Sequence, residues 1–332
     1  MARTTYFIIV IIVAFIPVTA CPVSWAANYF LERQFSSSYI QDMEVFPDSG
    51  DILVATYCKG IFLGTDNGNT WVQCNKGLVS LCINCILVNP ENYDQIYIGT
   101  CMDGVYVSKN RARTWEPAHF GLEYLDVIAL ACDPDKPSLI YAGTLGDGIY
   151  RSTDGGESWS HCSVGLGEKD IVAILVSPWQ SSIIYAAGFR GDVYCSKNNG
   201  QSWQFLSRIG ETGHFVTALK ATKQDPYCIY AATFGSGLMY SLDAGGHWIK
   251  CVHGLTDDFI WSLEIHHSDP YTLYVGTLME GIFISHDGGI HWQPFAREYI
   301  QSPSLEIALD SERPDRLYVG DYFGDIQILN AR

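Results

Sequence analysis

Hydrophobic and polar residues alternate along most of this chain in short paired runs. Each pair consists of two apolar stretches joined by a short loop that contains glycine, which is the pattern of a β-hairpin. Seven such strings recur: ILVATYCKGIFL from Ile52, IYIGTCMDGVYV from Ile96, IYAGTLGDGIYR from Ile140, IYAAGFRGDVYC from Ile184, IYAATFGSGLMY from Ile229, LYVGTLMEGIFI from Leu273 and LYVGDYFGDIQI from Leu317. The pattern therefore predicts seven hairpins and an all-β fold.

Two further segments flank these hairpins. An apolar run, for example IVAILVSP, precedes each of the last six and ends near a proline. After each of the first six hairpins comes an octapeptide that ends in tryptophan, and these tryptophans, from Trp71 to Trp292, are separated by 44, 44, 44, 45 and 44 residues. One repeat is thus predicted to hold an inner strand, the hairpin, a tight turn, and a fourth strand that begins at the tryptophan.

Four antiparallel strands in each repeat of about 44 residues are typical of a β-propeller blade. Seven repeats predict one seven-bladed propeller over residues 28–332, with no room for a second domain. The seventh repeat ends at its third strand. We therefore expect residues 28–35 (NYFLERQF) to supply the missing outer strand and to close the ring.

The third position of each octapeptide is an acid or an amide, whose side chain can cap its own turn. These residues are Asp66, Asn110, Asp154, Asn198, Asp243 and Asp287. The pattern Ser-x-Asp-x-Gly-x-Ser/Thr-Trp resembles the Asp-box, or BNR repeat, and the resemblance covers nearly all of residues 28–332. The resemblance implies a structural role for the boxes, with the tryptophan packed between blades. Because Asn110 and Ala112 depart from the pattern, we expect the second turn to be the least regular.

Asp-box propellers include sialidases, xyloglucan-degrading hydrolases, sortilin-type receptors and photosystem II stability/assembly factor-like proteins. A fold does not choose among such functions. A single propeller behind an export signal is most similar to the assembly factor-like and sortilin-type proteins. That resemblance implies an assembly or binding function without a cofactor.

The N-terminus has the pattern of a secretory signal, in which Arg3 precedes the apolar run FIIVIIVAFI and small residues follow. Two cleavage sites compete. The sequence VTAC resembles a bacterial lipobox, which would make residues 1–20 the signal peptide and Cys21 a lipidated N-terminus, with 21–27 as a linker; cleavage before Ala27 would instead release a soluble protein. Both readings predict an exported protein in the periplasm or at the cell surface.

Charge and cysteine content narrow the function classes. The formal net charge of -16 would repel the phosphates of nucleic acid, so a nucleic-acid partner is excluded. Eleven cysteines suit an exported chain in which disulfides can form, although the sequence does not give their pairing. The motif Cys82-Ile-Asn-Cys85 lies in an apolar run without a second such motif, which does not favour a metal site.

Catalytic patterns are weak. A sialidase needs three arginines that converge on the substrate carboxylate, and we find no such set. The related xyloglucan hydrolases use a cleft between two propellers, whereas this chain contains one. The sequence therefore favours a non-catalytic protein, with a carbohydrate-active or glycan-binding propeller as the alternative.

The loops inside the hairpins should share one face of the disc with the starts of the inner strands. Their residues change from blade to blade while the strand pattern repeats, which is typical of a binding surface. The predicted binding residues are Tyr57, Asp103, Asp147, Arg190, Phe234, Trp261, Glu280 and Tyr322. Exposed aromatic and acidic side chains predict a scaffold that binds an exported or membrane protein complex, a peptide or a glycan.

Overall fold

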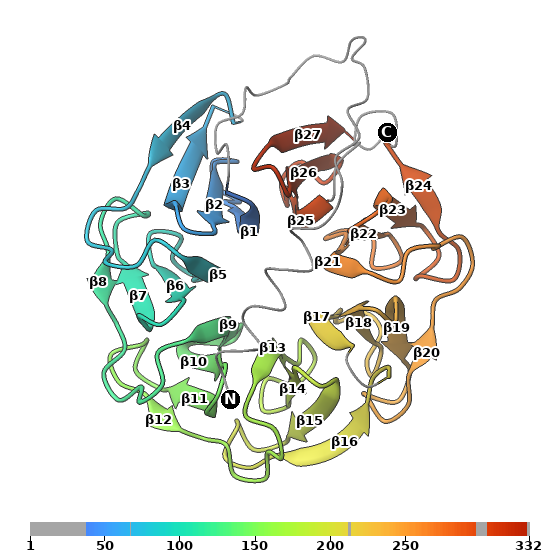
Figure 1. The fold of residues 1–332 in the computed structure, drawn as a ribbon, viewed down its shortest axis with the longest axis horizontal. Coiled ribbons are helices and arrows are strands. Elements are labelled where there is room, and N and C mark those ends of the chain that lie inside the picture. Colours follow the sequence, from blue (N-terminus) through green and yellow to red (C-terminus); the bar gives the residue numbers. More distant parts are fainter. Residues whose placement is uncertain (1–37, 67, 212–213, 297–303, 331–332) are drawn as a thin grey trace. The chain divides into compact units, whose positions relative to one another are not determined.

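The computed structural model describes residues 38–66, 68–211, 214–296 and 304–330, which form strands and connections without a helix. Within these residues no helix could therefore serve as a membrane span. The strands make seven antiparallel sheets in sequence order, arranged as blades around a centre (Figure 1). The predicted all-β seven-bladed propeller is confirmed.

Each of the first six blades contains four strands that are hydrogen-bonded in chain order. Blade 1 holds β1 (Ile40–Val45), β2 (Ile52–Thr56), β3 (Gly60–Thr65) and β4 (Thr70–Gln73), and blade 2 holds β5 (Ile83–Val88), β6 (Ile96–Thr100), β7 (Val105–Ser108) and β8 (Glu116–Pro117). Blade 3 holds β9 (Val127–Asp133), β10 (Lys136–Thr144), β11 (Gly148–Ser152) and β12 (Ser160–His161), and blade 4 holds β13 (Ile171–Val176), β14 (Ile184–Gly188), β15 (Asp192–Ser196) and β16 (Gln204–Arg208).

The remaining three blades continue the pattern. Blade 5 holds β17 (Phe215–Ala221), β18 (Ile229–Phe234), β19 (Leu238–Ser241) and β20 (Ile249–Lys250), and blade 6 holds β21 (Ile260–Ile265), β22 (Leu273–Thr277), β23 (Gly281–Ser285) and β24 (Gln293–Phe295). Blade 7 has three described strands, β25 (Ser304–Leu309), β26 (Arg316–Asp321) and β27 (Ile326–Asn330). The outer strand predicted from residues 28–35 lies outside the described residues and stays a prediction.

Within a blade, the second strand is buried whereas the fourth strand is exposed. The second strand is covered on both faces by the neighbouring blades, and all five residues of β2, β6, β14 and β22 are buried. The fourth strand is exposed and in three blades only two residues long. Each innermost strand contacts the innermost strands of both neighbouring blades, and the contact of β1 with β25 closes the ring.

The octapeptide turns are held by their own side chains. In blade 3 the Ser152 hydroxyl donates to Asp154 Oδ1 (2.7 Å) and accepts from the Gly156 N–H (2.8 Å), while Asp154 Oδ1 also accepts from the Ser158 N–H (2.9 Å). The Trp159 indole N–H then donates to the Ala118 carbonyl of blade 2 at 2.7 Å. This turn therefore closes on itself and ties its tryptophan to the preceding blade. The indole N–H groups of Trp115, Trp203 and Trp248 also bond to the preceding blade, whereas that of Trp292 donates to Gly289 of its own box.

The expectation that the second turn is the least regular is wrong. Asn110 Oδ1 accepts from the Thr114 N–H (2.9 Å), and Ser108 Oγ accepts from the Ala112 N–H (2.9 Å), as in the other blades. Ala112 takes the glycine conformation, with φ of 62°. The first box is the one that differs, because Gly64 replaces the serine and a Cβ there would lie 2.7 Å from the Trp71 ring.

Candidate functional site

The loop face is the side of the propeller that carries the loops between second and third strands and the residues just before the first strands. Backbone hydrogen bonds join these two sets within and between blades. In blade 1 the Tyr57 N–H donates to the Tyr39 carbonyl (3.1 Å), and the Gly60 N–H donates to the Leu81 carbonyl at the start of blade 2 (2.8 Å). The octapeptide turns bond instead to the connections between first and second strands, as Gly288 does to Tyr271 (2.9 Å), so they lie on the opposite face.

One run of stacked rings lies on blades 4 to 6 of the loop face. Phe215 stacks on Phe189 and on Phe234, each with ring centroids 5.0 Å apart and nearly parallel planes. Phe234 also meets Phe259 at 4.8 Å and the edge of Trp261 at 6.0 Å. These contacts lie within the usual range for paired aromatic rings and connect three successive blades.

A second run lies on blades 7 and 1. Tyr39 stacks between Tyr57 (4.8 Å) and Tyr322 (5.8 Å), and Phe323 packs edge-on to Tyr322 (5.6 Å). The buried pair Phe234 and Leu278 packs against members of both runs, namely Tyr39, Phe215, Trp261 and Tyr322. We call this joined set, with Phe189, Phe259, Tyr57 and Phe323, the aromatic arc; it spans blades 4, 5, 6, 7 and 1.

The structure brings together four of the predicted binding residues, Tyr57, Phe234, Trp261 and Tyr322, in the aromatic arc. Their exposure differs from the expectation. Phe234 is only 9 % exposed, because Leu278 and Trp261 of the next blade cover it. It therefore packs beneath the more accessible rings and offers little surface to a ligand. The most accessible rings of the arc are those of Phe259 and Phe323, which are 39 % and 42 % exposed.

The predicted acidic residues accept hydrogen bonds that fix the loops of this face. Asp103 accepts hydrogen bonds from the Tyr106 hydroxyl (2.6 Å) and the Ser80 N–H (3.1 Å), and Glu280 accepts from the Thr256 hydroxyl (2.7 Å). Asp147 accepts from the Tyr150 hydroxyl (2.6 Å) and from Lys169 (3.1 Å). Burial alone would raise the pKa of Asp147, but those two partners and nearby His161 lower it below its usual value. Asp147 lies with Tyr150 and His161 in a hollow of about 460 Å³, away from the arc's residues.

Arg190, the remaining predicted residue, has an exposed side chain whose Nε lies 3.7 Å from Glu168. Glu168 was missed by the sequence analysis because no motif marks it. Its carboxyl accepts the Arg190 backbone N–H (3.2 Å) and is buried, and burial raises its pKa to about 7. A carboxyl that stays partly protonated near neutral pH can act as an acid, so this residue matters for any catalytic alternative.

A charged cluster on the innermost strands was also missed. Its members are Asp42 and Glu44 of β1, Lys220 of β17, Glu264 of β21 and Glu306 of β25, and we call them the inner cluster. Blades 5 and 1 are not neighbours, yet Lys220 lowers the pKa of Glu44, so these groups interact across the middle of the ring. A comparison of the repeats could have shown this cluster, because charged residues replace apolar ones in it. The positions of Asp42 and Glu44 correspond to Ala129 and Ala131 in β9 and to Ala173 and Leu175 in β13.

Burial governs the inner cluster's ionisation. It raises the pKa of Asp42 to about 7 and that of Glu44 to about 8, and it raises the pKa of Glu306 well above its ordinary value. Lys220 Nζ pairs with Glu264 Oε1 at 2.7 Å. Within the described residues no group of three or more donors has the geometry of a metal site.

Comparison with known proteins agrees with this architecture. Residues 150–161 and 283–294 match the family described as the BNR/Asp-box repeat. The chain is a seven-bladed propeller with Asp-box repeats. Its predicted resemblance to Asp-box propellers is thereby confirmed, and no curated protein sequence matches the chain.

Three solved structures with different functions have folds similar to that of this chain. The GH74 enzyme of Niastella koreensis (TM-score 0.72, 16 % identity) aligns with 87 % of this chain, which spans 52 % of the enzyme. The GH74 xyloglucanase of Xanthomonas campestris (TM-score 0.74, 16 % identity) aligns with 94 % of this chain, and the alignment covers 54 % of the xyloglucanase. YCF48 bound to D1 peptide (TM-score 0.69, 14 % identity) aligns with 94 % of this chain over 100 % of its own length.

This chain thus covers about half of each GH74 enzyme and all of YCF48. At identities below 20 %, these matches establish the fold alone.

Proposed function

We propose that this propeller is a non-catalytic binding module that holds an unstructured peptide segment of a partner protein on its loop face. The aromatic arc is the observation that carries the proposal. Rings from five blades present stacked, rigid, partly accessible surface, and aromatic side chains supply large contact area at low cost in conformational entropy. The YCF48 structure with its D1 peptide supports a peptide ligand for a propeller of this size.

Charge indicates the composition of the peptide. The chain has 36 acidic and 20 basic residues, and Asp103, Asp147 and Glu280 lie on loops of the same face as the arc. A negative field favours a positively charged ligand and speeds its association. The proposed ligand therefore combines aromatic or aliphatic side chains with lysine or arginine. If the N-terminal leader acts as predicted, the partner is an exported or membrane protein.

Selection from a displayed library of unstructured peptides tests this function. We expect the wild-type protein to enrich peptides that are basic and apolar, and the double variant Tyr57→Ala/Tyr322→Ala to bind them at least 100-fold more weakly. Truncation of an aromatic anchor typically costs about 2 kcal/mol, and two such losses exceed two orders of magnitude in Kd. The measurement is Kd by fluorescence anisotropy with one enriched peptide.

The matched control is Tyr271→Ala, which removes an exposed tyrosine from the opposite face and should leave Kd unchanged. Melting curves of all variants separate lost binding from lost folding. Equal binding by the double variant and the wild type would move the site away from the arc.

The carbohydrate-active alternative is carried by Glu168, whose raised pKa suits a general acid near the carboxylates Asp170 and Asp192. It predicts release of reducing ends from xyloglucan by the wild type and at least 100-fold slower release by Glu168→Gln. A wild type that is inactive on xyloglucan would contradict xyloglucan hydrolysis at Glu168.

Localisation is a separate proposal, because Cys21 and Ala27 lie outside the described residues. We expect mass spectrometry of the protein from its native envelope to find an acylated N-terminal Cys21. A mature N-terminus at Ala27 would instead indicate a protein without the lipid anchor.

A further inference from the structure

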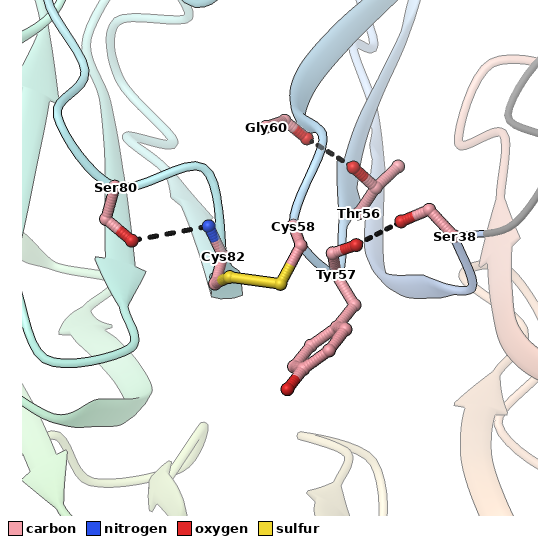
Figure 2. Close-up of a disulfide and its surroundings, with 7 residues drawn as sticks. All are labelled: Ser38, Thr56, Tyr57, Cys58, Gly60, Ser80 and Cys82. Carbon is pink, nitrogen blue, oxygen red and sulfur yellow. Dashed lines mark hydrogen bonds between the residues drawn. A yellow bond between two sulfur atoms is a disulfide. The ribbon is translucent and has the colours of Figure 1, made fainter. Parts of the chain in front are cut away.

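Three cysteines of the loop face lie at the seam between blades 1 and 2. Cys58 belongs to the loop between β2 and β3, Cys82 directly precedes β5, and Cys101 directly follows β6. A disulfide joins Cys58 to Cys82 and therefore links the two blades covalently (Figure 2). Cys101 carries a thiol and is partly accessible.

Cys101 is placed opposite Cys82 by the register of blade 2. Ile83 pairs with Thr100 in the antiparallel ladder, so Cys82 and Cys101 form the next pair, and the Cys101 N–H donates to the Cys82 carbonyl at 2.9 Å. Residues directly opposite in such a ladder point to the same face with Cα atoms about 4.5–5.5 Å apart. This separation lies within the range of about 4.4–6.8 Å that a disulfide requires.

The same repeat position in two other blades shows that side chains there do meet. In blade 1 the pair is Tyr39 and Tyr57, whose rings stack at 4.8 Å, and in blade 5 it is Phe215 and Phe234, whose rings stack at 5.0 Å. Cys82 thus has two cysteine neighbours, Cys58 of blade 1 and Cys101 of its own blade.

We propose that Cys101 exchanges with the Cys58–Cys82 disulfide, so that Cys82 can be bonded to either neighbour. The Cys101 thiol gives its proton to solvent, and its thiolate attacks Sγ of Cys82. The Cys82–Cys101 bond forms as the Cys58–Cys82 bond breaks, and Cys58 leaves as a thiolate that takes up a proton. The number of disulfides and thiols is unchanged, so the step needs neither an oxidant nor a reductant.

Exchange changes what the disulfide holds. In the observed state it fixes the loop of blade 1, in which Cys58 has a φ of 67° and directly follows Tyr57 of the aromatic arc. After exchange the bond lies within blade 2, and the loop of blade 1 keeps only its noncovalent contacts, namely its hydrogen bonds and the stacking of Tyr57 on Tyr39. The exchange thereby provides a covalent switch at one end of the arc, and it stands whether or not the arc binds a peptide.

Cys85 offers a matched control for this chemistry. It forms a CxxC motif with Cys82, but it lies inside β5, where its side chain is buried, and burial raises its pKa far above the ordinary thiol value. A buried thiol of that kind is a poor nucleophile. We therefore assign the exchange to Cys101 and not to Cys85.

Disulfide mapping of the full mature protein tests the proposal. The protein is incubated without reductant at about pH 8.5, near the ordinary pKa of a thiol, then alkylated in acid and digested for mass spectrometry. We expect linked peptides for both Cys58–Cys82 and Cys82–Cys101, with partial alkylation of Cys58. Cys101→Ser should reduce Cys58 alkylation to background, whereas Cys85→Ser should not change it.

The variant Cys58→Ser, made under the same oxidising conditions, isolates the second bond. We expect most of its molecules to contain the Cys82–Cys101 link. Complete alkylation of both Cys82 and Cys101 in this variant would overturn the proposal. So would a wild-type protein in which only Cys58–Cys82 is found and only Cys101 of the three cysteines is alkylated.

Discussion

Replacing Trp159 with alanine is expected to lower the free energy of unfolding by about 3–5 kcal/mol. Trp159 is 5 % exposed and belongs to the same buried cluster as Tyr97 and Val105 of the preceding blade and Leu122 of the following connection. Its indole N–H bonds to the Ala118 carbonyl, and Gly121, at a φ of 90°, lies so close that a Cβ there would be 2.3 Å from the Trp159 carbonyl oxygen. Alanine would leave a large cavity at the seam between blades 2 and 3. Urea unfolding followed by circular dichroism measures the loss.

Two further variants separate the sources of this stability. Trp159→Phe keeps most of the apolar contact but leaves the Ala118 carbonyl without its donor, which should cost about 1–3 kcal/mol. Phe120→Ala removes a neighbouring ring that is 78 % exposed and should change stability by less than about 0.5 kcal/mol. A Trp159→Ala protein as stable as Phe120→Ala would show that the box tryptophans do not hold the blades together.

The fold could be predicted because each blade repeats the same local pattern. The hairpin strings from Ile96 and Ile184, for example, become β6–β7 and β14–β15 within a residue at either end. The fourth strand was less well predicted. Trp71 lies within β4, but β8 and β12 begin one residue after Trp115 and Trp159, because those rings turn inward to the preceding blade and only the exposed residues beyond them extend the sheet.

The site was harder to predict because it depends on contacts between repeats. Tyr57 and Tyr322 stand out as aromatic loop residues, but the ring that joins them, Tyr39, was overlooked. Tyr39 directly precedes Ile40, just as Phe215 precedes Val216 and Phe259 precedes Ile260 in blades 5 and 6. An alignment of the repeats would therefore have found it. The burial of Phe234 and the partner of Cys82 each depend on an adjacent blade, which a repeat pattern does not specify.

The inner cluster makes the stability of the propeller depend on pH. The folded protein raises the pKa of Asp42 to about 7 and that of Glu44 to about 8, whereas an unfolded chain would titrate these groups near their ordinary values of about 4. Between these values the folded state binds more protons than the unfolded state. Stability is therefore highest at the acidic end of this range and is lost as the pH rises through about 7 to 8.

Lys220→Met should strengthen this dependence. Burial alone would lower the pKa of Lys220, but Glu264, Glu44 and Glu306 raise it, so the lysine stays charged and offsets their repulsion. Without it, the carboxylates of the inner cluster face one another when ionised. Breaking a fully buried pair costs roughly 3–5 kcal/mol. The side chains of Lys220 and Glu264 are 39 % and 20 % exposed, so water screens the pair and we expect about 2 kcal/mol at pH 8.

The same variant should lose less stability at pH 5 than at pH 8, because Asp42, Glu44 and Glu306 are then largely protonated in the folded protein and leave Lys220 only its pair with Glu264. Lys250→Met is the control, because Lys250 pairs with Asp258 at 2.6 Å on the partly exposed outer part of blade 5. A partly exposed pair of that kind contributes about 0–1 kcal/mol. Urea unfolding of the three proteins at both pH values measures the difference. A loss at Lys220 that is equal at pH 5 and pH 8 would mean that the lysine acts through its packing and its pair with Glu264 alone, and that Asp42, Glu44 and Glu306 are not held protonated by the fold.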